Sequence, residues 1–165
     1  LTSPRESLRL INSDSDIRLK SYIKGIDYTG EMTGFAQNAK DTISAFKPDG
    51  FILKSRSPSC GIKDVKVYAS IGKAPPLNFK SSGIFGKMMS EYYPDSIIED
   101  EGRLLNFTIR ENFYTVIFTM SDFRNTKRVG TMKALIDFHT KNKYLRKLHR
   151  SKIKMRQNLI KNSVM

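Results

Sequence analysis

Apolar residues recur along the chain with two different periods, which together predict alternating helices and strands. Over residues 30–46 they return at helical spacing, so we predict an amphipathic helix with Thr29 as its cap. A short apolar run at 51–53 follows a Pro-Asp-Gly turn at 48–50 and predicts a buried strand. Residues 65–68 alternate in the manner of another strand.

The same alternation continues toward the middle of the chain. Residues 83–93 suit a second helix, and 96–98 form a further candidate for a buried strand. A long helical pattern begins near Thr108 and closes the first domain. Helix, turn, strand and polar loop in this order are typical of a βαβ arrangement, so the sequence predicts an α/β domain with an appended segment.

The last part of the chain is predicted to be helical and basic. Residues 124–130 indicate a linker or a helix boundary, Thr131 begins a new amphipathic helix, and Ser151 is placed to cap another. From residue 124 onward there are thirteen Lys or Arg residues against one acid, Asp137, although the net charge of the whole chain is only +13. Such a segment favours a polyanionic partner, most simply nucleic acid. A solvated cationic helix without a specific partner explains the charge equally well.

The bulk composition restricts the class of protein further. A chain of 165 residues that is 39% hydrophobic can bury one core and part of a second. No apolar run approaches membrane-spanning length and the amino terminus lacks the pattern of a secretory signal, so we expect a soluble, cytoplasmic protein without a membrane partner. The single cysteine excludes an internal disulfide and a metal site built from cysteines of this chain alone.

The densest polar chemistry follows the strand predicted at 51–53. Residues 54–61, Lys-Ser-Arg-Ser-Pro-Ser-Cys-Gly, combine three hydroxyls, the thiol of Cys60 and two cations. Pro58 and Gly61 favour an ordered turn, and ligands bind at the carboxyl ends of strands in open α/β sheets. The segment is therefore a candidate site for a small molecule, an anion or a metal cluster. A cysteine is more often a small buried hydrophobic residue, and that interpretation stays open.

A second polar loop follows the strand predicted at 96–98. Residues 99–103 carry three acids, Gly102 and Arg103. Since both strands deliver polar residues at their carboxyl ends, the two loops are expected to face one pocket. An acidic turn in which Gly102 merely allows the bend is at least as compatible with the pattern.

Several motifs in this order resemble a known family. They lie at 54–61, 99–104, 110–113, 135–139 and 143–145. Together they resemble the two-domain proteins that join a thiouracil-desulfidase-like domain to a YbgA-like helical domain, and the resemblance covers nearly the whole chain.

The resemblance implies a partial Rossmann-like α/β domain at 1–123, lacking its first strands, followed at 124–165 by the truncated start of a basic helical domain. It implies an iron-sulfur enzyme that removes sulfur from thiouracil or from 4-thiouridine in tRNA. By this matching, Cys60 is the third cysteine ligand of a 4Fe-4S cluster and Ser57 is the serine implicated in the chemistry. Thiolates hold such clusters, an open iron is a Lewis acid for sulfur, and a serine can relay a proton.

The sequence also departs from this family. Two cluster cysteines that relatives carry before the segment matched at 4–6 are absent, there is no initiator methionine, and the end at Met165 falls within the helical domain. We therefore expect an internal fragment that would not assemble the cluster by itself and would be inactive alone. Asn142 stands where many relatives have a histidine.

The residues expected to contact substrate or RNA are all basic: Arg56, Arg103, Lys133, Lys141, Lys143, Arg146 and Lys147. The main alternative is a non-catalytic nucleic-acid-binding module with a basic helical tail, in which Cys60 is an ordinary buried thiol. A thiol-based anion-binding or redox domain is a third hypothesis, because Lys54 and Arg56 lie close to Cys60 in the sequence.

Overall fold

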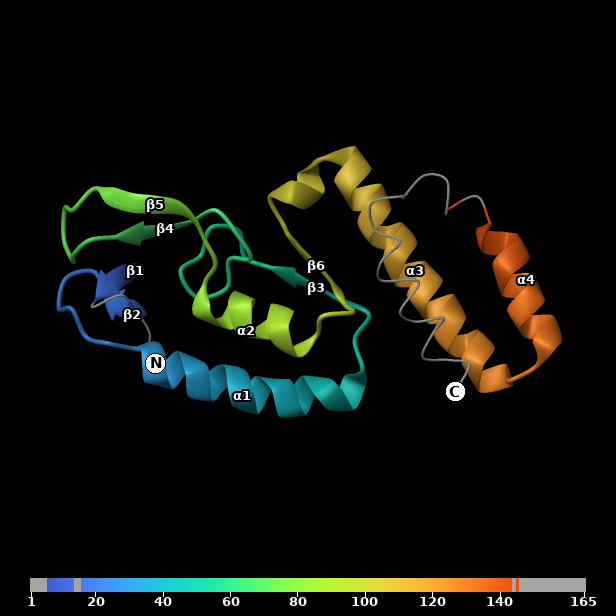
Figure 1. The fold of residues 1–165 in the computed structure, drawn as a ribbon. Coiled ribbons are helices and arrows are strands. Elements are labelled where there is room, and N and C mark those ends of the chain that lie inside the picture. Colours follow the sequence, from blue (N-terminus) through green and yellow to red (C-terminus); the bar gives the residue numbers. More distant parts are fainter. Residues whose placement is uncertain (1–5, 14–15, 144, 146–165) are drawn as a thin grey trace. The chain divides into compact units, whose positions relative to one another are not determined.

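The computed structural model describes residues 6–13, 16–143 and 145. This described part of the chain divides into two compact units, one within Leu1–Phe113 and one within Tyr114–Met165. Strands and helices alternate in the first unit, while the second is helical (Figure 1). The α/β fold predicted from the sequence is confirmed.

The larger sheet among the described residues has four strands in the order β2-β1-β4-β5. Strands β1 (Leu8–Ser13) and β2 (Asp16–Ser21) form an antiparallel hairpin, β4 (Val65–Tyr68) lies parallel to β1, and β5 (Pro76–Ser81) lies antiparallel to β4. The strand predicted at 65–68 is confirmed. The hairpin and β5 were not predicted as strands.

A second, two-stranded sheet pairs β3 (Gly50–Leu53) with β6 (Ile97–Asp100) in parallel. Both strands were predicted from their short apolar runs. The register places Leu53 opposite Asp100, so the chain leaves both strands at the same edge of the sheet.

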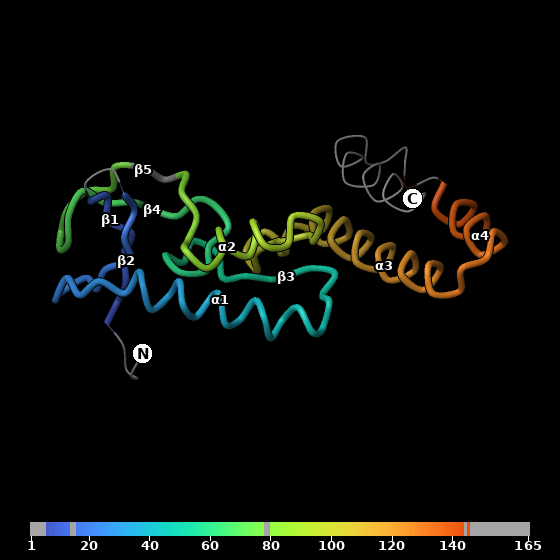
Figure 2. The backbone as a smooth tube through the Cα atoms, turned by 60° about the horizontal axis from the view of Figure 1, so that its bottom comes forward, coloured from blue at the N-terminus to red at the C-terminus, as the bar shows by residue number. Residues whose placement is uncertain are grey.

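Helices α1 (Thr29–Phe46) and α2 (Ile84–Tyr92) match the predicted helical stretches and lie side by side in the first unit (Figures 1 and 2). The rings of Phe35 and Phe85 are 5.7 Å apart between centroids. The hydroxyl of Tyr93 donates to the backbone oxygen of Lys40 over 3.0 Å, which ties the end of α2 to α1.

The core of the first unit forms where these helices begin. Its buried residues come from the four-stranded sheet and from the first turn of α1, and the start of α2 packs against them: Leu10, Leu19, Met32, Val65 and Val67, with Ile84 and Phe85 partly buried. Because α2 starts at this core, the loops at its amino end are held against well-packed structure.

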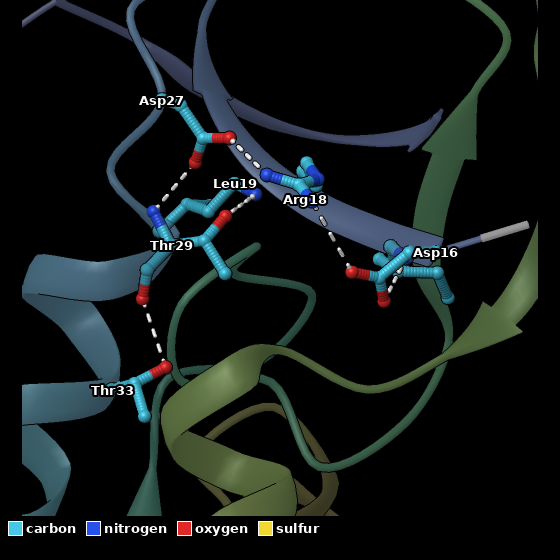
Figure 3. A network of polar contacts seen from close by, with 7 residues as sticks. Asp16, Arg18, Leu19, Asp27, Thr29 and Thr33 are labelled. Atoms are coloured by element: carbon cyan, nitrogen blue, oxygen red, sulfur yellow. Dashed lines mark hydrogen bonds and ion pairs between the residues drawn. The ribbon is translucent and has the colours of Figure 1, made fainter. Parts of the chain in front are cut away.

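Thr29 does not act as the cap that the sequence predicted. The residue before α1 is Tyr28, and no side chain caps the helix there. The Thr29 hydroxyl instead accepts a hydrogen bond from the Leu19 N–H over 2.8 Å, so it joins α1 to β2 (Figure 3). Asp27 accepts from the Thr29 N–H over 2.8 Å and from Arg18 over 3.2 Å. Hydrogen bonds from the Thr29 hydroxyl and backbone, and then the Arg18 guanidinium, lower the pKa of Asp27.

A short 3-10 turn, Arg103–Leu105, precedes α3 (Phe107–Val129). The predicted linker or boundary at 124–130 is wrong for most of its length, because α3 continues through it. The boundary lies at Gly130, whose φ of +68° is a left-handed conformation that glycine adopts without strain.

Helix α4 (Met132–Asn142) begins where the sequence predicted. The Thr131 hydroxyl caps it by accepting a hydrogen bond from the Ala134 N–H over 3.2 Å. Phe123 of α3 and Phe138 of α4 hold the two helices together, with ring centroids 5.4 Å apart. The further helix predicted after Ser151 lies outside the described residues. No helix in the described part of the chain is long and apolar enough to cross a bilayer.

Candidate active site at the carboxyl ends of β3 and β6

The parallel register of β3 and β6 brings the two polar loops together. Lys54 and Ser55 follow β3, and Glu101 follows β6. The Lys54 ammonium donates to Glu101 Oε1 over 2.6 Å, and the Ser55 hydroxyl donates to the same oxygen over 2.9 Å. The Ser55 N–H donates to the other oxygen, Oε2, over 2.7 Å. These hydrogen bonds bring the two loops together, while the shared pocket expected between them stays a prediction.

Glu101 is therefore held as a carboxylate. Hydrogen bonds from the Lys54 ammonium and the Ser55 N–H lower the pKa of Glu101 to about 2. At neutral pH it is an acceptor only, which matches the three donors that surround it. The sequence indicated acids in this loop but did not single out Glu101, since its role depends on the strand register.

The segment from Ser57 to Gly61 forms one capped helical turn. The Ser57 side-chain oxygen accepts from the N–H groups of Ser59 and Cys60, each over 3.3 Å. The Gly61 N–H donates to the Ser57 carbonyl over 2.8 Å. Serine at the cap and proline at the next position are the residues that such a turn prefers. Ser57 thus has a structural role that places Cys60 in the turn.

The three polar side chains of this turn also lie in a short row. Ser57 Oγ lies 3.0 Å from Ser59 Oγ, which lies 3.6 Å from Cys60 Sγ. The two N–H groups that Ser57 Oγ accepts leave its own proton available to Ser59, while either Ser59 or Cys60 can be the donor in the second contact. The row links the Ser57 hydroxyl to the sulfur of Cys60 through Ser59. Cys60 itself is half-buried, so it is neither a fully buried hydrophobic residue nor a fully exposed thiol.

The amino end of α2 fixes the other side of the turn. The N–H groups of Gly83, Ile84 and Gly86 donate to the carbonyls of Gly61, Pro58 and Ser59, respectively. These bonds satisfy helix donors that would otherwise lack partners.

Glycine is required for this approach. A Cβ at Gly83 would lie 2.5 Å from the Ser59 carbonyl, and one at Gly86 would lie 2.6 Å from the Cys60 carbonyl oxygen. The backbones of the turn and of α2 are therefore in direct contact, and the positions of Ser59 and Cys60 depend on it.

The cations near the turn have distinct surroundings. Lys54 is bound to Glu101, on the β6 side of the turn. Arg56 is exposed and has a φ of +53°, which a non-glycine residue adopts only when its neighbours constrain it. Arg103 donates from Nε to Glu99 Oε2 over 2.7 Å, and this hydrogen bond raises the pKa of Arg103.

The predicted basic residues of the second unit lie on or just after α4. Lys133, Lys141 and Lys143 are exposed. Lys141 donates to Asp122 of α3 over 2.6 Å. Arg146 and Lys147 lie outside the described residues. Asn142 is buried and donates to the Phe138 carbonyl over 2.9 Å, so its side chain stabilises the end of α4.

An α/β protein with a polar turn at the carboxyl ends of adjacent parallel strands has the general form of a ligand-binding or catalytic domain. The model of the 2-thiouracil desulfurase family matches residues 1–101, and the chain belongs to this family. The match includes the Ser57–Gly61 turn and ends at Glu101. The comparisons with curated proteins and with solved structures returned no match.

Proposed function

We propose that the protein removes sulfur from a thiolated uracil, either as free thiouracil or as 4-thiouridine in tRNA. The observation that carries the proposal is the capped turn at Ser57–Gly61, which lies inside the region matched by the desulfurase family. In the overall reaction, water supplies the carbonyl oxygen of uracil and the sulfur leaves as hydrogen sulfide. Such a reaction needs a group that accepts sulfur and groups that move protons.

Cys60 and Ser57 are the residues that we assign to these tasks. A thiolate at Cys60 would be a ligand for iron, and the resemblance of the motif around Cys60 supports a role for it in holding a 4Fe-4S centre. The contact between the hydroxyls of Ser57 and Ser59 supports our assignment of Ser57 to holding or moving a proton.

The donor set of this chain alone does not fit a complete cluster. Cys60 is its only cysteine, and no group of three His, Cys, Asp or Glu side chains that could hold a metal occurs among the described residues. Cys60 can supply one thiolate, so the other ligands would have to come from polypeptide outside these 165 residues. Cys60 is therefore assigned as one ligand of the cluster.

The protein expressed from its own gene and purified without oxygen provides the test. Wild type is expected to release sulfide from 2-thiouracil, and Cys60→Ala is expected to release none. Ser57→Ala should lower the rate by about a hundredfold or more if Ser57 moves a proton. Ser70→Ala is the control, because Ser70 is exposed and bonds only locally in the described part of the chain.

The cap function of Ser57 requires a separate control, because Ser57→Ala also removes two accepted hydrogen bonds. Ser57→Thr keeps both the hydroxyl and the ability to cap, so it is expected to retain most of the activity. Full activity in Cys60→Ala would refute the ligand assignment. A Ser57→Ala protein that is less stable but fully active would leave Ser57 with the cap function alone.

We propose that tRNA, when it is the substrate, binds to the helical unit. Residues 114–143 contain six Lys or Arg residues and two acids, and Lys133 is exposed on α4. Lysines there would neutralise phosphates and release counterions, so affinity should fall steeply as salt is added. Arg56 directly precedes Ser57 and Arg103 follows the β6 loop, so we assign both to the substrate itself, although Arg103 must contact it while paired with Glu99.

A filter-binding titration of tRNA at several salt concentrations tests this part. The double variant Lys133→Glu with Lys143→Glu is expected to weaken binding and to reduce the salt slope by about one for each phosphate that is no longer neutralised. The control is the double variant Lys63→Glu with Lys73→Glu, which makes the same change in charge. Both lysines are exposed and belong to the first unit. Equal effects of the two pairs would refute an assignment to the helical unit.

The two substrates and the alternative function give different results. Sulfide release from thiouracil without tRNA binding would identify the free base as substrate. Binding of tRNA without sulfide release from either substrate would favour the non-catalytic module.

A further inference from the structure

The Ser57–Gly61 turn is anchored on two sides. Helix α2 holds it through the backbone contacts of Gly83 and Gly86. Glu101 holds the chain just before it, through both the N–H and the hydroxyl of Ser55. The turn and the residue before its entry are thus held by two elements, α2 and the loop after β6, that both lie far from the turn in the sequence.

Arg56 is the one residue between the Glu101 anchor and Ser57. Its φ of +53° is unfavourable for a side chain other than glycine, so this conformation persists because both neighbours are held. Removal of one anchor would allow Arg56 to return to an ordinary conformation. The peptide that follows, with Ser57, would then rotate.

The backbone of the β6 loop also lies next to Ser55. A Cβ at Gly102, the residue after Glu101, would lie 3.4 Å from Ser55 Oγ, an ordinary van der Waals contact. The Ser55 hydroxyl therefore has both Glu101 and Gly102 as neighbours. This arrangement gives the carboxylate a fixed geometry even though its side chain is 41% exposed.

We propose that Glu101 is a positioning residue that fixes the orientation of Ser57 and Cys60 by holding Ser55. The relevance to catalysis rests on the proposed function, whereas the mechanical claim about the turn does not. Glu101 is not assigned a contact with any reacting group, and its effect on the reaction passes through Ser55 and Arg56.

The single cysteine allows a direct test, since any thiol reagent reports on Cys60 alone. The rate of labelling by 4,4′-dithiodipyridine at pH 7 is measured in the 165-residue protein. Glu101→Gln replaces a carboxylate that accepts three hydrogen bonds with an amide, whose NH2 group cannot accept any. We therefore expect the turn to open more often and Cys60 to be labelled about tenfold faster.

Asp122→Asn is a closely matched control. Asp122 binds Lys141 over 2.6 Å, the same distance as between Glu101 and Lys54. The acid side chains are 40% and 41% exposed, and the lysine side chains 70% and 72% exposed, in the Asp122 and Glu101 pairs respectively. This control is expected to leave the labelling rate within twofold of wild type. A Glu101→Gln rate equal to that of Asp122→Asn would overturn the proposal.

A double-mutant cycle with Ser55→Ala separates positioning from a general loss of stability. If Glu101 acts through Ser55, the two substitutions together should change labelling by much less than the product of their separate effects. Multiplicative effects would contradict the assignment. Ser55→Ala alone, which keeps Glu101 paired with Lys54, is expected to increase labelling about threefold, and it remains informative if Glu101→Gln does not fold.

The kinetic counterpart uses the native protein with thiouracil. Misplaced site residues should lower kcat about tenfold in Glu101→Gln and leave KM within twofold, whereas a loss of folded protein alone would leave kcat per folded molecule unchanged. An equal change in kcat for Asp122→Asn would contradict the proposal. If wild type shows no sulfide release, the proposed function fails, while the labelling result still decides the role of Glu101.

Discussion

Replacement of Gly86 by alanine tests the packing of α2 against the site turn. A Cβ there would lie 2.6 Å from the carbonyl oxygens of Cys60 and Gly61, closer than the separation of about 3.3 Å at which carbon and carbonyl oxygen normally meet. The neighbours are backbone atoms, so they cannot move aside as a flexible side chain would. The Gly86 N–H also donates to Ser59 over 3.2 Å, and this bond would be broken or distorted.

The size of the effect follows from a comparison with Gly34→Ala in α1. Nothing lies within 4 Å of a Cβ at Gly34, so alanine should stabilise the helix by about 0.5–1 kcal/mol. Gly86→Ala gains the same helix propensity but adds about 1–3 kcal/mol of overpacking and about 1 kcal/mol for the broken bond. The free energies of unfolding of the two variants should therefore differ by about 2–4 kcal/mol.

Urea unfolding of both variants measures this difference through the midpoint at a common slope. Cys60 labelling should also be faster in Gly86→Ala, because the turn loses its anchor on α2. If Gly86→Ala is as stable as Gly34→Ala and its Cys60 is labelled at the wild-type rate, the direct backbone packing of α2 on the turn is refuted.

Further predictions concern stability of the first unit. Leu10→Ala should lower the free energy of unfolding by about 2–5 kcal/mol, because Leu10 is fully buried. Leu105 is 83% exposed, so Leu105→Ala should change it by less than about 0.5 kcal/mol. The urea midpoints of the two variants measure this difference, and similar midpoints would contradict the assigned core. Asp27→Asn should destabilise at neutral pH, because the pKa of Asp27 is lowered by hydrogen bonds from Thr29. That stabilisation is present above the pKa of Asp27 in the unfolded chain, about 4, and is lost as the pH falls through its lower pKa in the folded protein. The difference in unfolding free energy between Asp27→Asn and wild type should therefore narrow on acidification. A difference independent of pH would contradict the prediction.

The elements that sequence predicted well are those in which burial imposes a clear period. Helix α1 and strands β3 and β6 have such patterns, and their bounds agree with the prediction within one or two residues. The β1–β2 hairpin was not predicted, although Arg9 and Arg18 stand at the polar positions between apolar residues. Arg9 is accommodated because its guanidinium stacks on tyrosine rings and donates to the Gly72 carbonyl, which lies 63 residues away in sequence.

For the site, the sequence predicted an ordered turn with Ser57 and Cys60, and the serine-proline order explains the cap that the structure contains. The part that could not be predicted depends on pairing between distant segments. Glu101 meets Ser55 only because β3 and β6 pair in one particular parallel register. A shift of one residue would exchange the faces of the strand and separate Glu101 from Ser55.

The most direct test of the account is the conversion of 2-thiouracil by the native protein in water enriched in oxygen-18, followed by mass spectrometry of the pyrimidine. Wild type is expected to form uracil carrying one oxygen-18 atom, with one hydrogen sulfide released for each, and Cys60→Ala is expected to form none. Uracil formation by Cys60→Ala at the wild-type rate, or no uracil from the wild-type protein, would contradict the assignment of sulfur removal to this turn.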